Sequence, residues 1–331
     1  MTAAQPGTED HPPTPGNDWR LFRGDGDSRE VAFPPPPPWR RFGPQEASPG
    51  RQSPRPRPYL IDPAEADVVN AALHLRRPLL VTGHPGTGKS SLAHAIAHEL
   101  ALGRVLHWPV NSRSTLQDAL YQYDAVGRLR EANLRRRAAT PELGIGHYVR
   151  LGPLGNALVS QERPRVLLID ELDKGDVDLP NDLLTVFEEG EFEIPELTRL
   201  PSDQSPVHVQ TDDPDVPTPV TRGRIRCREF PVVVITSNGE RDFPPAFLRR
   251  CVRLDLPEPD EDRLRDIVAA HLGQEALSDI DDLLEEFLSR RAPGELATDQ
   301  LLNAVFLRKG GVDLNAGRLI DAVLHQLGGA V

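Results

Sequence analysis

The stretch VTGHPGTGKSSLAHAI, residues 81–96, joins an apolar run to an amphipathic helix pattern through a glycine-rich loop. Just before the loop, PLLVTG at residues 78–83 is short and almost wholly apolar, as expected of a buried strand in a parallel sheet. After the loop, Leu92, Ile96 and Leu100 recur at every fourth position and predict a helix with one buried face. Strand, glycine loop and helix in this order predict an anion site at a helix N-terminus.

The loop fits the pattern G-x-x-x-x-G-K-[ST], in the strand and helix context that this pattern requires. Glycines let successive backbone N–H groups converge on one anion, and the helix N-terminus adds partial positive charge. Lys89 is expected to reach the outer phosphates of a nucleotide, and the Ser90 hydroxyl to ligate Mg²⁺. The predicted nucleotide-binding residues of the loop are Gly83, His84, Pro85, Gly86, Thr87, Gly88, Lys89, Ser90 and Ser91.

Two further apolar strand patterns end in polar side chains. VLLID at residues 166–170 ends in Asp170, which Glu171 follows directly. Because ligands of open α/β sheets bind at the carboxyl ends of strands, we expect Asp170 to join the Mg²⁺ shell. Glu171 is the predicted general base toward the attacking water. PVVVITSN at residues 231–238 ends in Asn238, which is expected to contact the γ-phosphate or the water; simple capping of the following turn stays open for it.

Apolar strands that alternate with helix patterns indicate a parallel α/β sheet flanked by helices. Order is expected to begin near Tyr59. A helix is then expected to start with Asp62 as N-cap and Pro63 in the first turn, and to run to about Leu75. We predict a P-loop nucleotide-binding domain over residues 59–256. Helix patterns without a strand pattern then predict an all-α domain over residues 257–331.

Residues 1–58 form a proline-rich arm, with PPPPP at residues 34–38. Proline removes backbone donors and favours an extended chain, so the arm is not expected to build a core. It is predicted to be a disordered, flexible tail. The alternative is a docking arm with aromatic anchors that fold onto a partner. These anchors are Trp19, Phe22, Phe33 and Trp39.

The chain has 331 residues and a formal net charge of −12, which argues against a dedicated nucleic-acid binder. Cys227 and Cys251 lack metal-ligand spacing and predict neither a zinc site nor a disulfide framework, which fits a reducing compartment. The N-terminus has no signal-peptide pattern, and no apolar run is long enough to cross a bilayer. A cytoplasmic location without membrane insertion is therefore expected.

The order of GHPGTGKS, LLIDELDK, ITSNGE and PPAFLRRC, followed by helix patterns, resembles the AAA+ ATPases, most closely their MoxR-like and dynein-related branch. The resemblance covers about residues 59–331 and implies ATP and Mg²⁺ as ligands. It implies that residues 83–90 are the Walker A motif, that Asp170 and Glu171 form Walker B, and that Asn238 is sensor 1.

The resemblance also implies a ring, usually a hexamer, with nucleotide bound between subunits. Arg249 and Arg250 are then candidates for an arginine finger, and Arg250 is preferred because it lies just before the position of the family's usual aromatic residue. Taken alone, the pair suits surface salt bridges equally well. The helix pattern PGELATDQLLNAV lacks the expected sensor 2 arginine, and Arg318 is a weak substitute.

Residues 111–150 and 189–230 resemble insertions that line or cover the pore in this branch. Tyr121 and Tyr123 are candidates to touch a threaded polypeptide, and ordinary packing is an equally open role for them.

Three functions stay open. The first is a ring ATPase that acts as a chaperone or remodels a partner protein, which in this branch often carries a von Willebrand A domain. The second is a slow nucleotide-dependent switch or scaffold, suggested by the missing sensor 2 arginine and the arm. The third is a nucleic-acid motor, supported only by the basic clusters at residues 133–137 and 222–228.

Overall fold

The computed structural model describes residues 21, 33–40, 59–138, 143–159, 162–213, 216–278, 280–290, 296–314 and 319–325. The chain divides into two compact units. The larger is Gln45–Arg263, and the smaller combines Met1–Pro44 with Leu264–Val331. The division falls within helix α9, Glu261–Leu272.

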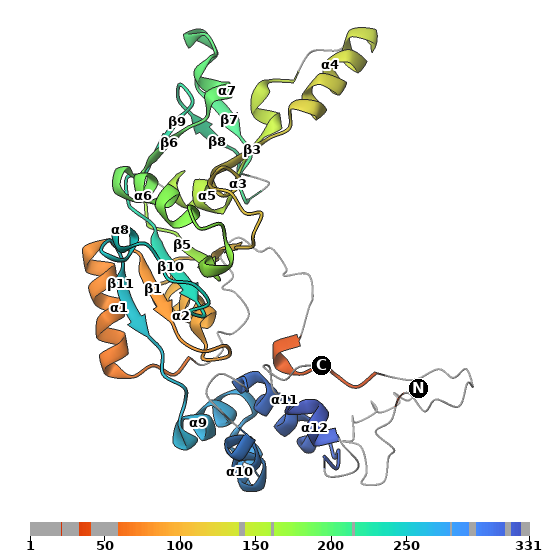
Figure 1. Ribbon diagram of the computed structural model, residues 1–331. Coiled ribbons are helices and arrows are strands. Elements are labelled where there is room, and N and C mark those ends of the chain that lie inside the picture. The colour runs from red at the N-terminus through yellow and green to blue at the C-terminus, as the bar shows by residue number, and fades with distance from the viewer. Residues whose placement is uncertain are drawn as a thin grey trace, which may run out of the picture. The chain divides into compact units, whose positions relative to one another are not determined.

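A five-stranded parallel sheet in the order β11-β1-β10-β5-β2 forms the centre of the larger unit (Figure 1). Its strands are β1 Leu79–Thr82, β2 Leu106–Pro109, β5 Val166–Asp170, β10 Val232–Ser237 and β11 Val252–Asp255. The strands predicted at residues 78–83, 166–170 and 231–238 are therefore confirmed. They are the three inner strands of the sheet, and the predicted parallel α/β fold class is confirmed with them.

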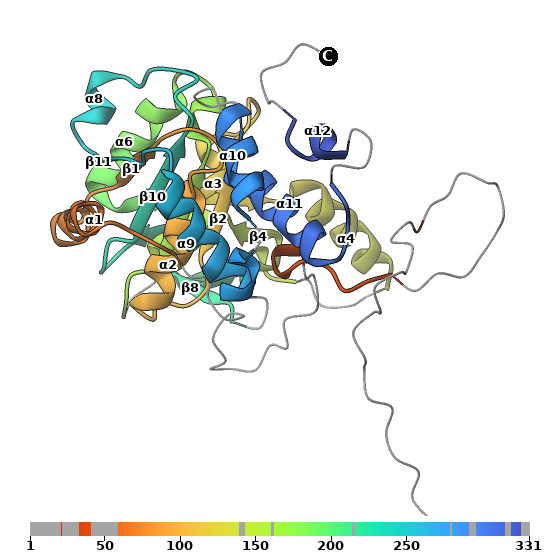
Figure 2. The same ribbon diagram turned by 90° about the horizontal axis from the view of Figure 1, so that it is seen from below.

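Helices cover both faces of this sheet (Figures 1 and 2). Alternate residues of each inner strand enter opposite cores: Leu80 and Leu167 pack on one side, and Leu79 and Leu168 on the other. Because both faces are buried, the inner strands read as continuous apolar runs. The first core is closed by α5, Pro153–Val159, and α6, Leu179–Glu189; the second is closed by α1, Pro63–Leu75, and α2, Lys89–Glu99.

Helix α1 begins where the sequence predicts. The Asp62 carboxylate accepts a hydrogen bond from the backbone N–H of Ala64 at 2.8 Å, and the Glu65 carboxylate accepts one from the N–H of Asp62 at 2.9 Å. This reciprocal capping box, with Pro63 in the first turn, satisfies N–H groups that a helix start leaves without partners.

Two excursions leave the sheet. In the first, β3, Tyr121–Tyr123, follows α3, Leu116–Leu120, and pairs antiparallel with β4, Val149–Leu151, with α4, Ala125–Ala138, and η2, Ile145–Tyr148, between them. The second contains two antiparallel pairs and two short helices. These elements are β6 Glu191–Glu193 with β9 Arg224–Arg226, β7 Val207–Val209 with β8 Thr218–Val220, α7 Pro195–Thr198 and η4 Ser202–Gln204.

Tyr121 and Tyr123, on β3 of the first excursion, make contacts within the chain. Tyr121 is buried, stacks on Phe192 with ring centroids 6.5 Å apart, and donates its hydroxyl to Glu196 at 3.0 Å. Tyr123 accepts a hydrogen bond from Arg128 at 3.1 Å. Packing is thus the role that the geometry gives Tyr121.

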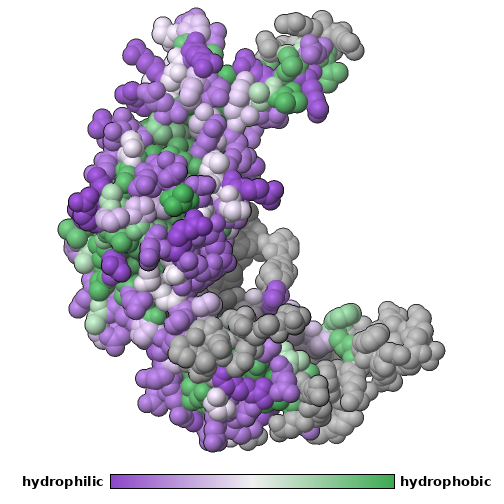
Figure 3. All heavy atoms as spheres, viewed as in Figure 1, coloured by the Kyte–Doolittle hydropathy of each residue, from purple (hydrophilic) through white to green (hydrophobic). Residues whose placement is uncertain are grey.

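Helix α4 instead exposes apolar side chains. Val126, Leu129 and Leu134 are 59%, 65% and 64% exposed. Figure 3 shows hydrophobic residues gathered on this helix.

The described part of the smaller unit contains helices and no strand, as predicted. Its α-helices are the second part of α9, α10 Asp281–Arg290, α11 Thr298–Lys309 and α12 Leu319–Val323, with the short η1 Pro38–Arg40 and η5 Gln274–Leu277. A single core that includes Leu264, Phe287 and Leu301 joins the α-helices. Within the residues that the structure describes, no helix is long and apolar enough to cross a membrane.

Candidate nucleotide-binding site

The glycine loop between β1 and α2 needs its glycines. Gly83, Gly86 and Gly88 all have positive φ, at 142°, 80° and 89°. A Cβ on Gly83 would lie 2.6 Å from the carbonyl oxygen of Leu256, so a larger residue does not fit there. Gly88 is the N-cap of α2 and has no side chain to cap it, so the first N–H groups of the helix are available to an anion.

Lys89 extends back across the loop and is only 6% exposed. Its Nζ donates hydrogen bonds to the carbonyl oxygens of Gly83 at 2.7 Å and His84 at 2.8 Å. Burial lowers the pKa of Lys89, and nearby carboxylates, first among them Asp173, act in the opposite direction. The loop therefore holds a cation beside the N-terminus of α2.

Asp170, at the end of β5, meets the loop directly. Its Oδ1 accepts hydrogen bonds from the hydroxyls of Ser90 at 2.6 Å and Thr236 at 2.7 Å, and its Oδ2 lies 3.2 Å from Nε2 of His107. Burial by itself raises the pKa of Asp170, but these side-chain hydrogen bonds outweigh burial and lower the pKa to about 2. A hydroxyl beside an ionised carboxylate is the oxygen donor set that Mg²⁺ prefers.

Glu171 follows Asp170 in an unusual backbone conformation, with φ of 58°. A non-glycine residue is held there only when its surroundings enforce it, and such strain is typical of functional sites. Its backbone N–H donates to Thr236 Oγ1 at 2.8 Å. Its carboxylate accepts from Asn238 Nδ2 at 3.2 Å and from Lys174 Nζ at 2.9 Å. The structure thus brings Asn238 to Glu171, at the same sheet edge as the loop.

Residues 78–251 match the family model of the AAA domain, dynein-related subfamily, which is more than half of the chain. The chain belongs to this family. The match confirms the resemblance stated from the motifs, and it supports the prediction of an ATPase. The search among curated proteins found no match.

Solved structures that resemble this AAA protein include NtrX from Brucella abortus in complex with ATP. That structure has 16% identity and a TM-score of 0.44, over 82% of this chain and 57% of the other. A candidate ATPase from Cytophaga hutchinsonii has 11% identity and a TM-score of 0.37, over 73% and 56%. The chain thus spans little more than half the length of these two structures.

Four side chains of this AAA site escaped the sequence reasoning. They are Thr236, His107, Lys174 and Asp173. Asp173 is 3% exposed, and its Oδ2 accepts from the backbone N–H groups of Asn238 and Glu240, each at 3.0 Å. It therefore fixes the turn that carries Asn238. In the sequence, the signal for Asp173 is this further carboxylate three residues after Asp170.

The two neighbouring arginines differ in their surroundings. Arg250 is bound within its own chain: Nε lies 2.5 Å from Glu188 Oε1, and its guanidinium also donates to the carbonyl oxygen of Ala246 at 3.1 Å. Arg249 has an exposed side chain, while its carbonyl oxygen accepts from Arg77 at 2.9 Å. Arg318 lies outside the described residues.

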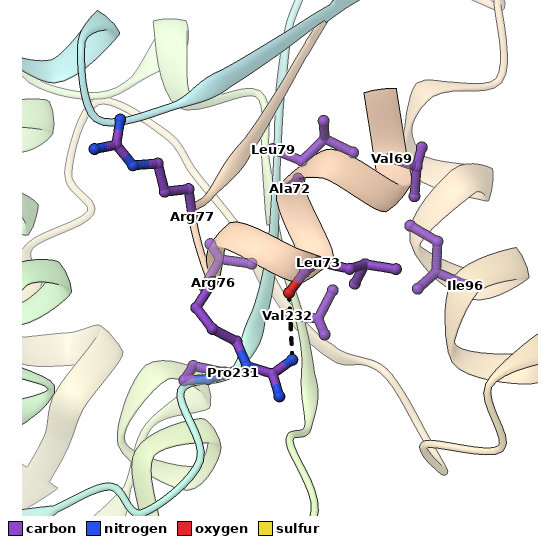
Figure 4. A pocket seen from close by; sticks show the side chains of 10 residues that line it. Val69, Ala72, Leu73, Arg76, Arg77, Leu79, Ile96, Pro231 and Val232 are labelled. Atoms are coloured by element: carbon purple, nitrogen blue, oxygen red, sulfur yellow. Dashed lines mark hydrogen bonds between the residues drawn. The ribbon is translucent and has the colours of Figure 1, made fainter. Parts of the chain in front are cut away.

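A small apolar crevice of about 10 Å³ is not part of this site (Figure 4). It is lined by residues such as Ala72, Leu79 and Val232, with Arg76 and Arg77 beside them. Leu79 and Val232 begin β1 and β10, whereas the glycine loop and Asn238 follow the ends of these strands. The crevice therefore lies at the opposite edge of the sheet, and its volume suits about one water molecule.

Proposed function

We propose that this AAA protein binds ATP with Mg²⁺ and hydrolyses it. The observation that carries the proposal is the 2.6 Å contact between Ser90, at the start of α2, and Asp170, at the end of β5. This contact joins a phosphate-binding loop to the acidic pair Asp170 and Glu171. Ser90 and Asp170 would hold Mg²⁺, which would supply positive charge to stabilise the charge that develops on the phosphates.

Residues of the chain bind the phosphates, accept the proton of water and position the groups that do so. Lys89 donates to the outer phosphates, as do the N–H groups that begin α2. The carboxylate of Glu171 accepts the proton of the attacking water. Asn238 and Lys174 orient that carboxylate. The Thr236 hydroxyl connects Glu171 to Asp170, because it accepts from the backbone N–H of Glu171 and donates to the Asp170 carboxylate.

Lys89→Ala tests nucleotide binding. The charge-assisted contact of the Lys89 ammonium with phosphate is lost, so we expect affinity for ATP to fall by about 10- to 100-fold. Titration with a fluorescent ATP analogue measures the change. Lys309→Ala is the control, because Nζ of Lys309 donates to Leu272 within the smaller unit. Equal affinity of wild type and Lys89→Ala would contradict the proposed site.

Thr236→Val tests the link between the acidic residues. Valine keeps the shape of the side chain but removes the hydroxyl that donates to Asp170 and accepts from the N–H of Glu171. Losing two buried hydrogen bonds predicts ATP hydrolysis about 10- to 100-fold slower. Steady-state phosphate release measures it.

Thr198→Val is the matched control for Thr236→Val. The Thr198 hydroxyl donates to the carbonyl oxygen of Pro195 in an excursion from the sheet, and we expect unchanged turnover. A Thr236→Val variant as active as this control would mean that the hydroxyl only packs.

The resemblance implies assembly into a ring, with a hexamer as the expected size, and the exposed Arg249 supports this proposal. A finger must leave its own subunit to complete a neighbour's site. The backbone of Arg249 is held by Arg77 while its side chain is exposed. Arg250 is engaged with Glu188, so the geometry favours Arg249 over the residue that the motif prefers.

The client is proposed to be a protein, and α4 to contact it. The exposed Val126, Leu129 and Leu134 suit burial against an apolar protein surface, although the same helix also carries the basic cluster at residues 133–137. The exposed apolar side chains support a chaperone or remodeller, and the resemblance to the MoxR-like branch implies a partner with a von Willebrand A domain. A cytoplasmic location is proposed with it, because Cys227 and Cys251 are free thiols.

A slow nucleotide switch is the second candidate, favoured by the surroundings of Glu171. Both carboxylate oxygens accept hydrogen bonds, from Asn238 and Lys174. Each oxygen retains a lone pair for water, but two protein donors restrain the carboxylate from reorienting toward it, which would slow turnover. Low basal turnover that a partner protein does not raise would support this candidate over a remodeller.

A further inference from the structure

Within the described residues of the proline-rich arm, Trp39 is the aromatic side chain that packs against the core of the smaller unit. Trp39 lies in the short turn η1, where Arg40 N–H donates to Pro37 O at 2.8 Å. Its indole Nε1 donates to Oδ1 of Asn303 at 3.1 Å. Its ring meets Phe306 edge-on, with centroids 5.8 Å apart and planes at 70°. Asn303 and Phe306 are three residues apart on α11 and therefore share a face of that helix.

This contact satisfies both ends of the tryptophan. A half-buried indole needs an apolar surface for its ring and an acceptor for its N–H. Phe306 and the hydrophobic core of the unit provide the surface, and Asn303 provides the acceptor. The five prolines before Trp39 restrict the backbone of the arm, so ordering this segment costs less entropy than ordering a flexible chain.

Phe33 shows that aromatic character alone does not dock the arm. It lies six residues before Trp39 in the same segment, yet its side chain is 83% exposed. The position of Trp39, with an acceptor and an aromatic ring opposite it, makes the difference. Phe33 is therefore a matched control for Trp39.

We propose that the face of α11 formed by Asn303 and Phe306 is a binding site for a proline–tryptophan segment. The chain fills the site itself, with Trp39 of its segment 33–40. Residues 33–40 thus act as a latch, by which we mean a segment of the chain that packs onto the smaller unit and completes its core. The family match at residues 78–251 includes neither side of this contact. The proposal does not depend on ATP hydrolysis.

Hydrogen exchange of the full-length chain tests the latch. Trp39→Ala removes both contacts, so amides of α11 around Asn303 and Phe306 are expected to exchange about tenfold faster or more. Phe33→Ala is expected to exchange like wild type. Trp39→Phe keeps an aromatic ring without the N–H donor and is expected to fall between them. Equal exchange in Trp39→Ala and Phe33→Ala would overturn the proposal, and Trp39→Phe decides it if the alanine variant does not fold.

A labelled peptide, FPPPPPWR, tests whether the site recognises the segment. Fluorescence anisotropy is expected to show binding to full-length Trp39→Ala, whose site is vacant, and at least about tenfold weaker binding to wild type, whose site is filled. In the double variant Trp39→Ala, Asn303→Ala, the affinity for the peptide is expected to be about fivefold to tenfold lower than in Trp39→Ala. Equal binding to all three chains would overturn the site. Protection of α11 that rises with protein concentration would assign the latch to a second copy and overturn the assignment to the same chain.

Discussion

Glu171→Gln is expected to bind ATP as tightly as the wild type and to hydrolyse it about 10²- to 10⁴-fold more slowly. Glutamine keeps the size of the side chain and still accepts a hydrogen bond, but it does not take a proton from water. The ion pair with Lys174 is lost; such exposed pairs contribute about 0–1 kcal/mol, so the fold should survive. Single-turnover hydrolysis, measured beside equilibrium binding, separates the chemical step from affinity.

Glu240→Gln is the matched control for this prediction. Glu240 lies two residues beyond Asn238, and its side chain is exposed. Its backbone N–H, which donates to Asp173, is untouched by the substitution. We expect wild-type hydrolysis from it. A Glu171→Gln chain that hydrolyses ATP at the wild-type rate would show that another group is the base.

Strand burial decides which strands the sequence could predict. The three inner strands are covered on both faces, so their apolar runs stand out. The edge strands β2 and β11 alternate instead: His107 and Arg253 are more exposed than their neighbours Trp108 and Leu254. Four residues of alternating character between loops give too short a pattern to separate from a turn.

The same topology explains which site residues were missed. Ser90 and Asp170 belong to recognisable motifs, so their meeting was predictable from the motif alone. Thr236 reaches Asp170 because β10 lies between β1 and β5, and strand order is not written in any local pattern. His107 reaches Asp170 from the edge strand β2, which neighbours β5. Contacts that depend on the order of strands in the sheet therefore cannot be predicted from local sequence patterns and are seen only in the folded structure.

The second prediction with a large expected effect concerns Arg249 and Arg250. If sites are shared between subunits, the specific ATPase activity of the wild type rises with protein concentration. Arg249→Ala is expected to be about 10³-fold or more less active, even at concentrations at which it assembles, because the neighbouring site loses its finger. Arg250→Ala loses a partly exposed ion pair with Glu188, worth about 0–1 kcal/mol, and is expected to keep most of its activity. Light scattering in the same samples reports assembly.

Mixing two inactive variants separates a finger from a residue of the protein's own site. Arg249→Ala retains an intact glycine loop, and Lys89→Ala retains an intact Arg249. Where the first supplies the loop and the second supplies the arginine, a complete site forms between them, so activity should reappear on mixing. Arg249→Ala and Glu171→Gln should complement one another for the same reason. Lys89→Ala and Glu171→Gln damage the same half of the site, so their mixture should stay inactive. Full activity in both arginine variants, independent of concentration, would mean that each chain hydrolyses ATP alone. An inactive Arg250→Ala beside an active Arg249→Ala would identify Arg250, which the motif favours, as the finger.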